Sequence, residues 1–231
     1  MVRQNAGRAG SVRLDDSSRD PQKIYEAFLF NGRLNCDMPP QSIDELRSAV
    51  ATMKAKGLNS QQIADELSLS QTTIQWLSSS QQPLEDHPAD IRVGWRSIAV
   101  KGERIESISE IFADIMMEEI GTEVDAIVGI SINGIPFATC IAAGMDLELS
   151  VARSISEEEG GHLSEVFAGV KGKRVVVIDD VVSSGLTMRK TIEHLTNAGA
   201  ETVLCLVLVN KTWMDEIDGV PLRALVRAAR I

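Results

Sequence analysis

Apolar residues follow two different periods along the chain. Between residues 39 and 80 they recur at helical spacing in three short segments, whereas from residue 91 onward short unbroken apolar runs alternate with longer amphipathic segments. The first pattern predicts a small all-α domain over 39–80, and the second predicts an α/β domain with a central, mainly parallel sheet over 91–231. Residues 81–90 are predicted to form a linker. Residues 1–38 are predicted to be a largely disordered or extended tail.

Serines mark the expected helix starts in the small domain. Ser42 is followed three residues later by Glu45, which is the spacing of a capping box. Gly57 is a suitable stop for this first helix. Ser60 and Ser70 are the expected N-caps of a second and a third helix.

The second and third helical segments have the spacing of a helix-turn-helix. Only Ser68 and Leu69 separate them, and Ala64 is small enough to let the two helices approach. The apolar core would consist of Ile63, Leu67, Leu69, Ile74 and Leu77.

In this interpretation the third helix reads DNA. Its outward positions are predicted to be Ser70, Gln71, Thr72 and Gln75, with Trp76 further along. Glutamine can bond adenine through two hydrogen bonds, and a threonine methyl can contact thymine. The helix has no Arg or Lys, so phosphate contacts would come from Arg47, Lys54, Lys56 or the tail. A helical protein–protein module without a DNA role remains the alternative.

The most informative segment of the large domain is residues 175–187. Four β-formers, 175–178, predict a buried parallel strand that delivers Asp179 and Asp180 to its C-terminal end, where ligands bind in open α/β sheets. The small, hydroxylated loop that follows precedes a helix predicted from Met188 to Asn197, and such a loop can cradle a phosphate. Carboxylates beside a phosphate cradle suit a ribose 5-phosphate. An apolar strand that ends in two acids also suits a Walker B element, but the chain contains no P-loop motif, which argues against a P-loop NTPase.

A second strand-to-loop-to-helix unit precedes this segment. Residues 126–130 read as a buried strand, and Pro136 is placed to open the next helix. The intervening turn consists of Ser131, Ile132, Asn133 and Gly134.

These two segments together resemble the type I phosphoribosyltransferase fold. Residues 175–187 are similar to that family's motif for phosphoribosyl pyrophosphate (PRPP). The resemblance implies ribose binding by Asp179 and Asp180 and phosphate binding by Val182, Ser183, Ser184, Gly185, Leu186 and Thr187. It implies that the 131–134 turn binds pyrophosphate. With the helix-turn-helix, the chain from about Ser42 to Ile231 is similar to the archaeal orotate phosphoribosyltransferase-like regulators of the GfcR class.

The GfcR resemblance implies a DNA-binding transcriptional regulator that dimerises and senses PRPP or a related sugar phosphate, with Mg²⁺ accompanying PRPP and no cofactor required for DNA binding. Departures from the orotate enzymes argue against catalysis, and no catalytic residue is assigned. Arg153 matches the family's arginine as a pyrophosphate contact, but three glutamates, 157–159, follow where lysines are expected. His162 is the remaining candidate acid, but a solvated loop histidine is the favoured interpretation. Asn210-Lys211 stands where the orotate enzymes have an Asp-Arg pair whose arginine binds the carboxylate of the base, and lysine lacks the planar fork for such bidentate binding. An active phosphoribosyltransferase with an appended module is the rival function, and a ligand-binding protein without a DNA role is a third.

Composition narrows the functional classes to which the chain could belong. The 231 residues are 44% hydrophobic, enough for a core, and the formal net charge of −10 excludes a generally basic nucleic-acid binder. Cys36, Cys140 and Cys205 are odd in number and far apart, so they suggest neither a disulfide framework nor a metal site. No signal segment or membrane-length apolar run is seen, which predicts a cytoplasmic protein with no membrane partner.

Overall fold

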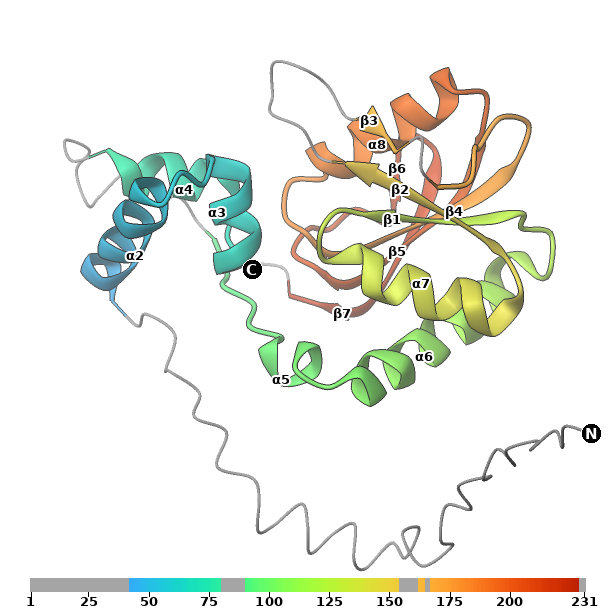
Figure 1. The fold of residues 1–231 in the computed structure, drawn as a ribbon, viewed down its shortest axis with the longest axis horizontal. Helices are drawn as coiled ribbons and strands as arrows, with labels where there is room; N and C mark the ends of the chain where they lie inside the picture. The colour runs from blue at the N-terminus through green and yellow to red at the C-terminus, as the bar shows by residue number, and fades with distance from the viewer. Residues whose placement is uncertain (1–41, 80–89, 154–161, 165–166, 229–231) are drawn as a thin grey trace, which may run out of the picture. The chain divides into compact units, whose positions relative to one another are not determined.

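A computed structural model describes residues 42–79, 90–153, 162–164 and 167–228 (Figure 1). The predicted tail and all but the last residue of the predicted linker lie outside the described residues. So does the glutamate-containing loop 154–161. Within the described ranges, no helix is long and apolar enough to cross a membrane.

Three helices, α2 (Ile43–Ala55), α3 (Ser60–Leu67) and α4 (Gln71–Ser78), form the helical part. Local capping explains where they start. Ser42 and Glu45 form the predicted capping box, and Ser70 caps α4 by accepting a hydrogen bond from the Thr73 amide. The prediction for α3 is wrong by one residue: Asn59 is the N-cap and forms its own capping box with Gln62. An asparagine side chain caps as well as serine does, so the pattern around Ser60 did not separate the two.

The core of the helical part contains all the apolar residues predicted from the sequence. Trp76 is a correction, because it is only 3% exposed and packs in this core rather than facing outward. It lies three residues after the buried Thr73, which places both on the inner face of α4. The Arg47 guanidinium lies 4.9 Å from the Trp76 ring centroid, so this predicted phosphate-binding arginine is engaged in a cation–π contact.

The α/β part contains one sheet with the strand order β3-β2-β1-β4-β5-β7-β6. The central strands β1 (Ala126–Ile130), β2 (Glu148–Arg153), β4 (Arg174–Val182), β5 (Glu201–Asn210) and β7 (Val220–Arg227) are all parallel. Two-residue strands, β3 (His162–Leu163) and β6 (Glu216–Ile217), close the edges in antiparallel pairing. This is the mainly parallel sheet that the alternating pattern predicted.

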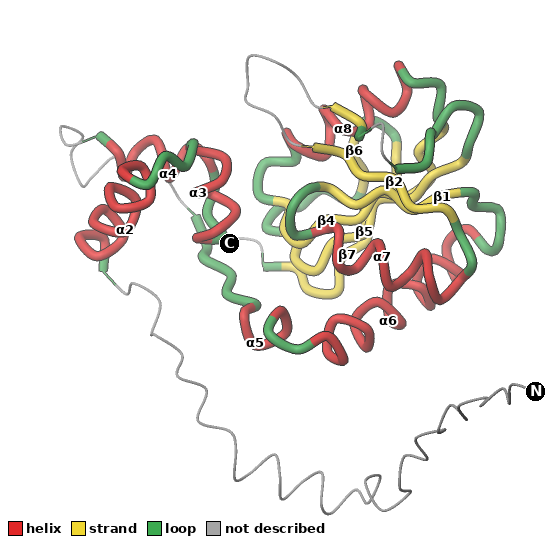
Figure 2. The backbone as a smooth tube through the Cα atoms, viewed as in Figure 1, coloured by secondary structure: helices red, strands yellow, loops and turns green. Residues whose placement is uncertain are grey.

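Helices cover both faces of the sheet, as Figure 2 shows. The helices α6 (Gly102–Ile120) and α7 (Gly134–Met145) pack on one face with Val176 and Ile178 of β4, and α8 (Leu186–Asn197) packs on the other with Val175 and Val177. A short helix, α5 (Arg96–Ala99), precedes α6. Coverage on both faces explains why β4 reads as an unbroken apolar run.

Candidate functional site

The two predicted acids lie within β4 rather than after it. The strand continues to Val182, four residues beyond the predicted end, so the alternation of side chains persists through the pair. Asp179 therefore shares the α8 face with Val177, and Asp180 shares the α7 face with Ile178. The two carboxylates are 9% and 8% exposed. They divide the site into two sides, one for each neighbouring loop.

Asp180 is held by side chains from two other segments. Trp95 Nε1 donates to Asp180 Oδ2 at 2.8 Å, and Asn133 Nδ2 donates to the same oxygen at 3.0 Å. The Val181 amide donates to Asp180 Oδ1 at 2.8 Å. Asn133 was predicted as part of the pyrophosphate loop, whereas Trp95 was not predicted as a site residue. Its ring packs 5.5 Å from that of Phe137, which fixes the indole beside the strand end.

Burial governs the electrostatics of this acidic pair. It raises the pKa of Asp179 well above the usual range, and the charge of Asp180 raises it further. Burial also raises the pKa of Asp180, although hydrogen bonds from Trp95, Asn133 and the Val181 amide oppose the shift. Two buried carboxylates this close disfavour double ionisation, so the pair is stabilised by any ligand that supplies hydroxyl donors or a cation.

The phosphate-loop residues surround a small cavity of about 30 Å³, lined by Asp179 and residues 181–188. Gly185 precedes α8 with a φ of +79°, and a Cβ there would lie 2.8 Å from the Met214 methyl carbon, so only glycine fits without displacement. The helix starts at Leu186, two residues earlier than predicted. Leu186 and Thr187 therefore form the first turn of α8, which favours an anion at this point.

The predicted pyrophosphate loop lies against the same strand end. It joins β1 to α7, and a Cβ on Gly134 would clash with the Ile178 carbonyl oxygen, which explains the glycine at the first position of α7. Ser131, Ile132 and Asn133 line one cavity together with Asp179 and Asp180. The structure thus brings together the two loops that the sequence separates by more than forty residues.

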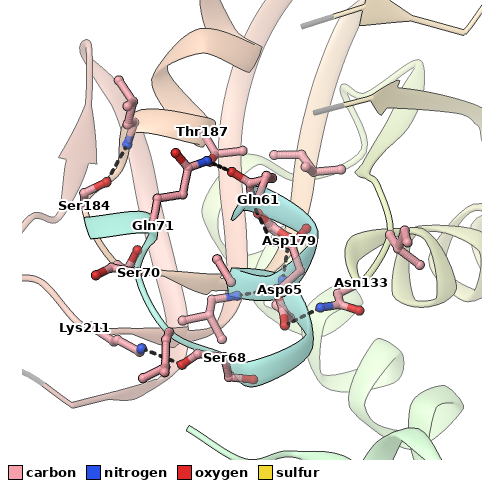
Figure 3. Close-up of a pocket in the computed structure, with 18 of the residues that line it drawn as sticks. Gln61, Asp65, Ser68, Ser70, Gln71, Asn133, Asp179, Ser184, Thr187 and Lys211 are labelled. Atoms are coloured by element: carbon pink, nitrogen blue, oxygen red, sulfur yellow. Dashed lines mark hydrogen bonds between the residues drawn. The ribbon is translucent and has the colours of Figure 1, made fainter. Parts of the chain in front are cut away.

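This main cavity has a volume of about 130 Å³ and also contains residues of the helical part (Figure 3). The helical part contributes Gln61, Asp65, Ser68, Ser70, Gln71 and Thr72 to its lining. The α/β part contributes Lys211, the residue that directly follows β5. Three of the four predicted DNA-binding residues therefore line the candidate ligand site. Gln75 is exposed on α4 and is not among the lining residues. Gln61, Asp65 and Lys211 were not predicted as cavity residues, since no local sequence signal reports contacts between distant segments.

Arg153 is not among the residues that line the cavity, and the side chain of His162 lies outside the described part of the structure. Arg153 is exposed at the C-terminal end of β2, where it pairs with the backbone of His162 in β3. The pyrophosphate contact predicted for Arg153 has no counterpart among the described lining residues.

A buried ion pair connects the helices to the α/β part. Lys211 Nζ lies 3.2 Å from Asp90 Oδ1, with the two side chains 5% and 7% exposed, and it donates to the Ser68 carbonyl oxygen at 3.0 Å. The other oxygen of Asp90 accepts from the Ser70 amide at 2.7 Å and from Thr73 Oγ1 at 2.9 Å. Burial raises the pKa of Asp90, but the Ser70 amide, the charge of Lys211 and the Thr73 hydroxyl outweigh it and hold that pKa below its usual value.

Asp65 brings a third carboxylate to the cavity. Burial raises the pKa of Asp65 to about 6, opposed by a 2.7 Å hydrogen bond from Gln61 and reinforced by the charge of Asp180. Gln61 also accepts a hydrogen bond from Gln71, so α3 and α4 present a linked polar surface to the acidic pair (Figure 3). Of the described residues that line the cavity, Lys211 alone is basic.

Known proteins define the class of this architecture. Residues 94–214 match the phosphoribosyl transferase domain family. An adenine phosphoribosyltransferase from Thermoanaerobacter pseudethanolicus shares the fold, with a TM-score of 0.50 at 18% identity over 63% of this chain and 93% of that one. The chain therefore contains a phosphoribosyltransferase-type domain preceded by a small helical domain.

Two relatives identify the family more narrowly. The transcriptional regulator GfcR of Thermoplasma acidophilum is 46% identical over 190 residues, which cover 81% of this chain and 96% of that protein. GfcR of Picrophilus torridus is 42% identical over 194 residues, covering 83% and 100%. The chain belongs to the GfcR family of transcriptional regulators, as the resemblance implied.

Proposed function

We propose that this regulator binds DNA through α3 and α4 and binds PRPP or a related sugar phosphate at the end of β4. One observation carries the proposal: the acidic pair and the first turn of α8 lie in one site. The same chain also has a helix-turn-helix. The ribose hydroxyls would donate to Asp179 and Asp180, and the 5′-phosphate would accept from the backbone amides of residues 183–187.

Magnesium fits this proposal as a companion of the ligand. The described residues form no cluster of three or more metal-ligating side chains, so a cation here would share its coordination with diphosphate oxygens. Asp179 and Asp180 supply carboxylate oxygens of the type that Mg²⁺ prefers. A bound cation would also reduce the repulsion within the acidic pair.

The regulator would act on DNA as a homodimer. Helix-turn-helix proteins place two recognition helices about 34 Å apart on half-sites separated by one DNA turn. Sedimentation equilibrium of the full chain tests this part of the proposal, and a monomer at micromolar concentration contradicts it.

Direct titrations test the two binding activities. We expect calorimetry with PRPP and Mg²⁺ to show binding that Asp180→Asn weakens. We expect a duplex selected from a random DNA library to bind in an anisotropy assay, with weaker binding by Gln75→Ala. Lys173→Met is the control for both assays, because Lys173 precedes β4 at the opposite end of that strand. The proposal fails if PRPP produces no heat or if selection returns no duplex.

A phosphoribosyltransferase reaction is the second candidate, favoured by the complete pair of loops around the acidic residues. The three glutamates at 157–159 argue against it, because carboxylates near a leaving diphosphate raise the barrier. Incubation with PRPP and each nucleobase, followed by a pyrophosphate assay, separates the candidates. Turnover would establish the enzyme, and binding without release of pyrophosphate supports the sensor.

A further inference from the structure

One cavity is lined by two sets of residues that the proposed function assigns to different ligands. Ser70, Gln71 and Thr72, at the start of the recognition helix, lie in the same lining as Asp179 and Asp180. Figure 3 shows Gln71 bonded to Gln61, and both residues line the cavity together with Thr187 and Asp179. In this arrangement Ser70 and Gln71 are partly buried against the ligand site, whereas Thr72 stays exposed, so only part of the N-terminal turn of α4 is open to DNA.

The contacts that hold α4 in this position resemble those that DNA would make. The Ser70 amide, at the N-terminus of α4, donates to the Asp90 carboxylate at 2.7 Å. Helix N-termini and their amides are common donors to DNA phosphates, and they favour negative charge for the same reason. Asp90 thus supplies an internal anion to this end of α4. Lys211 neutralises that anion and also binds the Ser68 carbonyl, which fastens the helix-turn-helix to the end of β5.

The same arrangement leaves little room or charge for a sugar diphosphate. The cavity of about 130 Å³ is below the roughly 300 Å³ at which pockets for small molecules begin. Asp65 adds its carboxylate to those of Asp179 and Asp180, so an incoming phosphate would meet a third acid at close range. Removal of α3 from the cavity would provide both the space and the loss of negative charge.

We propose that this structure is a locked state in which the helix-turn-helix occupies the sugar-phosphate site, and that ligand and helices compete for it. The Asp90–Lys211 ion pair is the fastening, that is, the contact that stabilises this locked state. A sugar phosphate at the acidic pair displaces α3 and α4, which exposes Ser70 and Gln71 to DNA. The ligand is therefore an activator of DNA binding. This inference rests on the proposed function for its two ligands, although the lock itself can be tested without either.

Linkage in the unaltered full chain gives the first test. We expect saturating PRPP with Mg²⁺ to raise affinity for the selected duplex about 5- to 150-fold, the usual range of allosteric coupling. Because coupling of binding is reciprocal, the duplex must raise PRPP affinity by the same factor. Anisotropy measures the first quantity and calorimetry the second.

A charge substitution at the fastening gives the second test. Lys211→Met keeps an apolar stem but removes the bonds to Asp90 and Ser68, so we expect it to bind the duplex without PRPP as tightly as the unaltered chain does with PRPP. Lys173→Met is the matched control, because Lys173 also bonds one carboxylate, that of Glu148, and one carbonyl, that of Gly169. The control should bind DNA as the unaltered chain does.

Hydrogen exchange of the Ser70 amide provides a measurement that needs no DNA and checks folding of each variant. We expect Lys211→Met, and PRPP with the unaltered chain, to accelerate this exchange while the amides of β4 and β5 stay protected. If Lys211→Met loses the protection of β4, Asp90→Asn takes its place in every assay.

The outcomes separate the lock from the proposed function. If PRPP does not bind but Lys211→Met accelerates Ser70 exchange, the proposed effector fails and the lock stands. If PRPP and DNA both bind, and PRPP leaves DNA affinity unchanged or lowers it, the lock is overturned and the proposed function stands. Unchanged Ser70 exchange in Lys211→Met and Asp90→Asn also overturns the lock.

Discussion

Asp90 and the acidic pair, Asp179 and Asp180, are buried carboxylates that differ in what surrounds them. Asp90 has a lysine, a backbone amide and a hydroxyl as partners, and these hold its pKa below the usual value despite its burial. Asp179 has another carboxylate as its neighbour, and its pKa is raised. Burial raises the pKa of both carboxyl groups and is the largest cause in each. The donors and the positive charge around Asp90 reverse that shift, whereas the charge of Asp180 adds to the shift of Asp179.

This difference separates a residue that holds the structure from the two residues for which we propose a ligand. The hydrogen-bonding capacity of Asp90 is used within the chain, so its ionised form is part of the folded state. The acidic pair is stabilised by what a bound sugar phosphate and its cation would bring. A site of this kind lowers the stability of the free protein, which is a common cost of a binding function.

The largest effect is expected from removing Asp90. Asp90→Ala leaves Lys211 buried without its carboxylate, and breaking a buried pair in this way costs about 3–5 kcal/mol. Urea unfolding at neutral pH measures the loss. Arg189→Ala breaks the exposed pair with Asp218, whose N–O distance is 3.0 Å, and should cost no more than about 1 kcal/mol. Equal losses in the two variants would contradict the assignment of Asp90 as a fastening.

Asp179→Asn should act with the opposite sign on stability. The raised pKa of Asp179 means that its ionised form opposes folding, and the penalty grows as the pH rises through that pKa. In the unaltered chain the Asp180 amide donates to Asp179 Oδ1 at 2.9 Å. An asparagine side chain keeps this acceptor oxygen and removes the negative charge. We expect a gain of about 0.5–2 kcal/mol in thermal unfolding at neutral pH. PRPP affinity should fall at least about tenfold, as for a lost hydrogen bond to a charged group. A destabilised variant would show that the pair is satisfied without a ligand.

Asp65 should make the lock depend on pH. Its pKa of about 6 in the locked state lies above the usual carboxyl value, so protonation stabilises the lock, which is fully favoured below about pH 4 and weakens as the pH rises through 6. Asp179, Asp180 and Lys211 share the cavity with it. We expect DNA affinity to rise roughly tenfold from pH 5 to 7.5, since one pKa unit corresponds to a factor of ten. Asp65→Asn should reduce this slope to the part contributed by the acidic pair, and an unchanged slope would assign the dependence elsewhere.

The smallest effect is expected at Trp95. Trp95→Phe keeps the packing against Phe137 but removes the donor to Asp180 Oδ2, which raises the pKa of that carboxyl. Because Asn133 still holds the same oxygen, PRPP affinity should fall by only about 1 kcal/mol, or about fivefold. Calorimetry with PRPP measures the change. A loss as large as that of Asp179→Asn would indicate that the indole contacts the ligand itself.

Local sequence signals predicted the fold and the two loops. The capping box at Ser42, the cap at Ser70 and the apolar run before Asp179 each depend on neighbours within a few residues, and each was found where expected. The parallel arrangement then brings the ends of β1 and β4 together without further information. Where a local rule allowed two solutions, as at Asn59 and Ser60, the prediction was wrong by one residue.

Contacts between distant segments could not be predicted in the same way. Lys211 was recognised only as a poor substitute for arginine, and its bonds to Ser68 and Asp90 join positions more than one hundred residues apart. Trp76 was placed outward because the recognition helix was assigned an exposed face before its packing against Arg47 was known. No periodicity reports such pairings, because they depend on how whole elements meet.

The turn between α3 and α4 is held by a residue of the same chain, and this covalent linkage affects how strongly DNA must bind. Ser68 has a φ of 52° there, and its carbonyl oxygen binds Lys211. Residues 80–89 connect α4 to Asp90, so the internal anion and the helix belong to one chain and meet at an effective concentration that short tethers place in the millimolar range. An operator present at nanomolar concentration must outcompete this tethered anion. Even a weak fastening can therefore set the threshold at which the regulator responds, and small changes at Lys211 would shift that threshold without altering any residue that touches DNA.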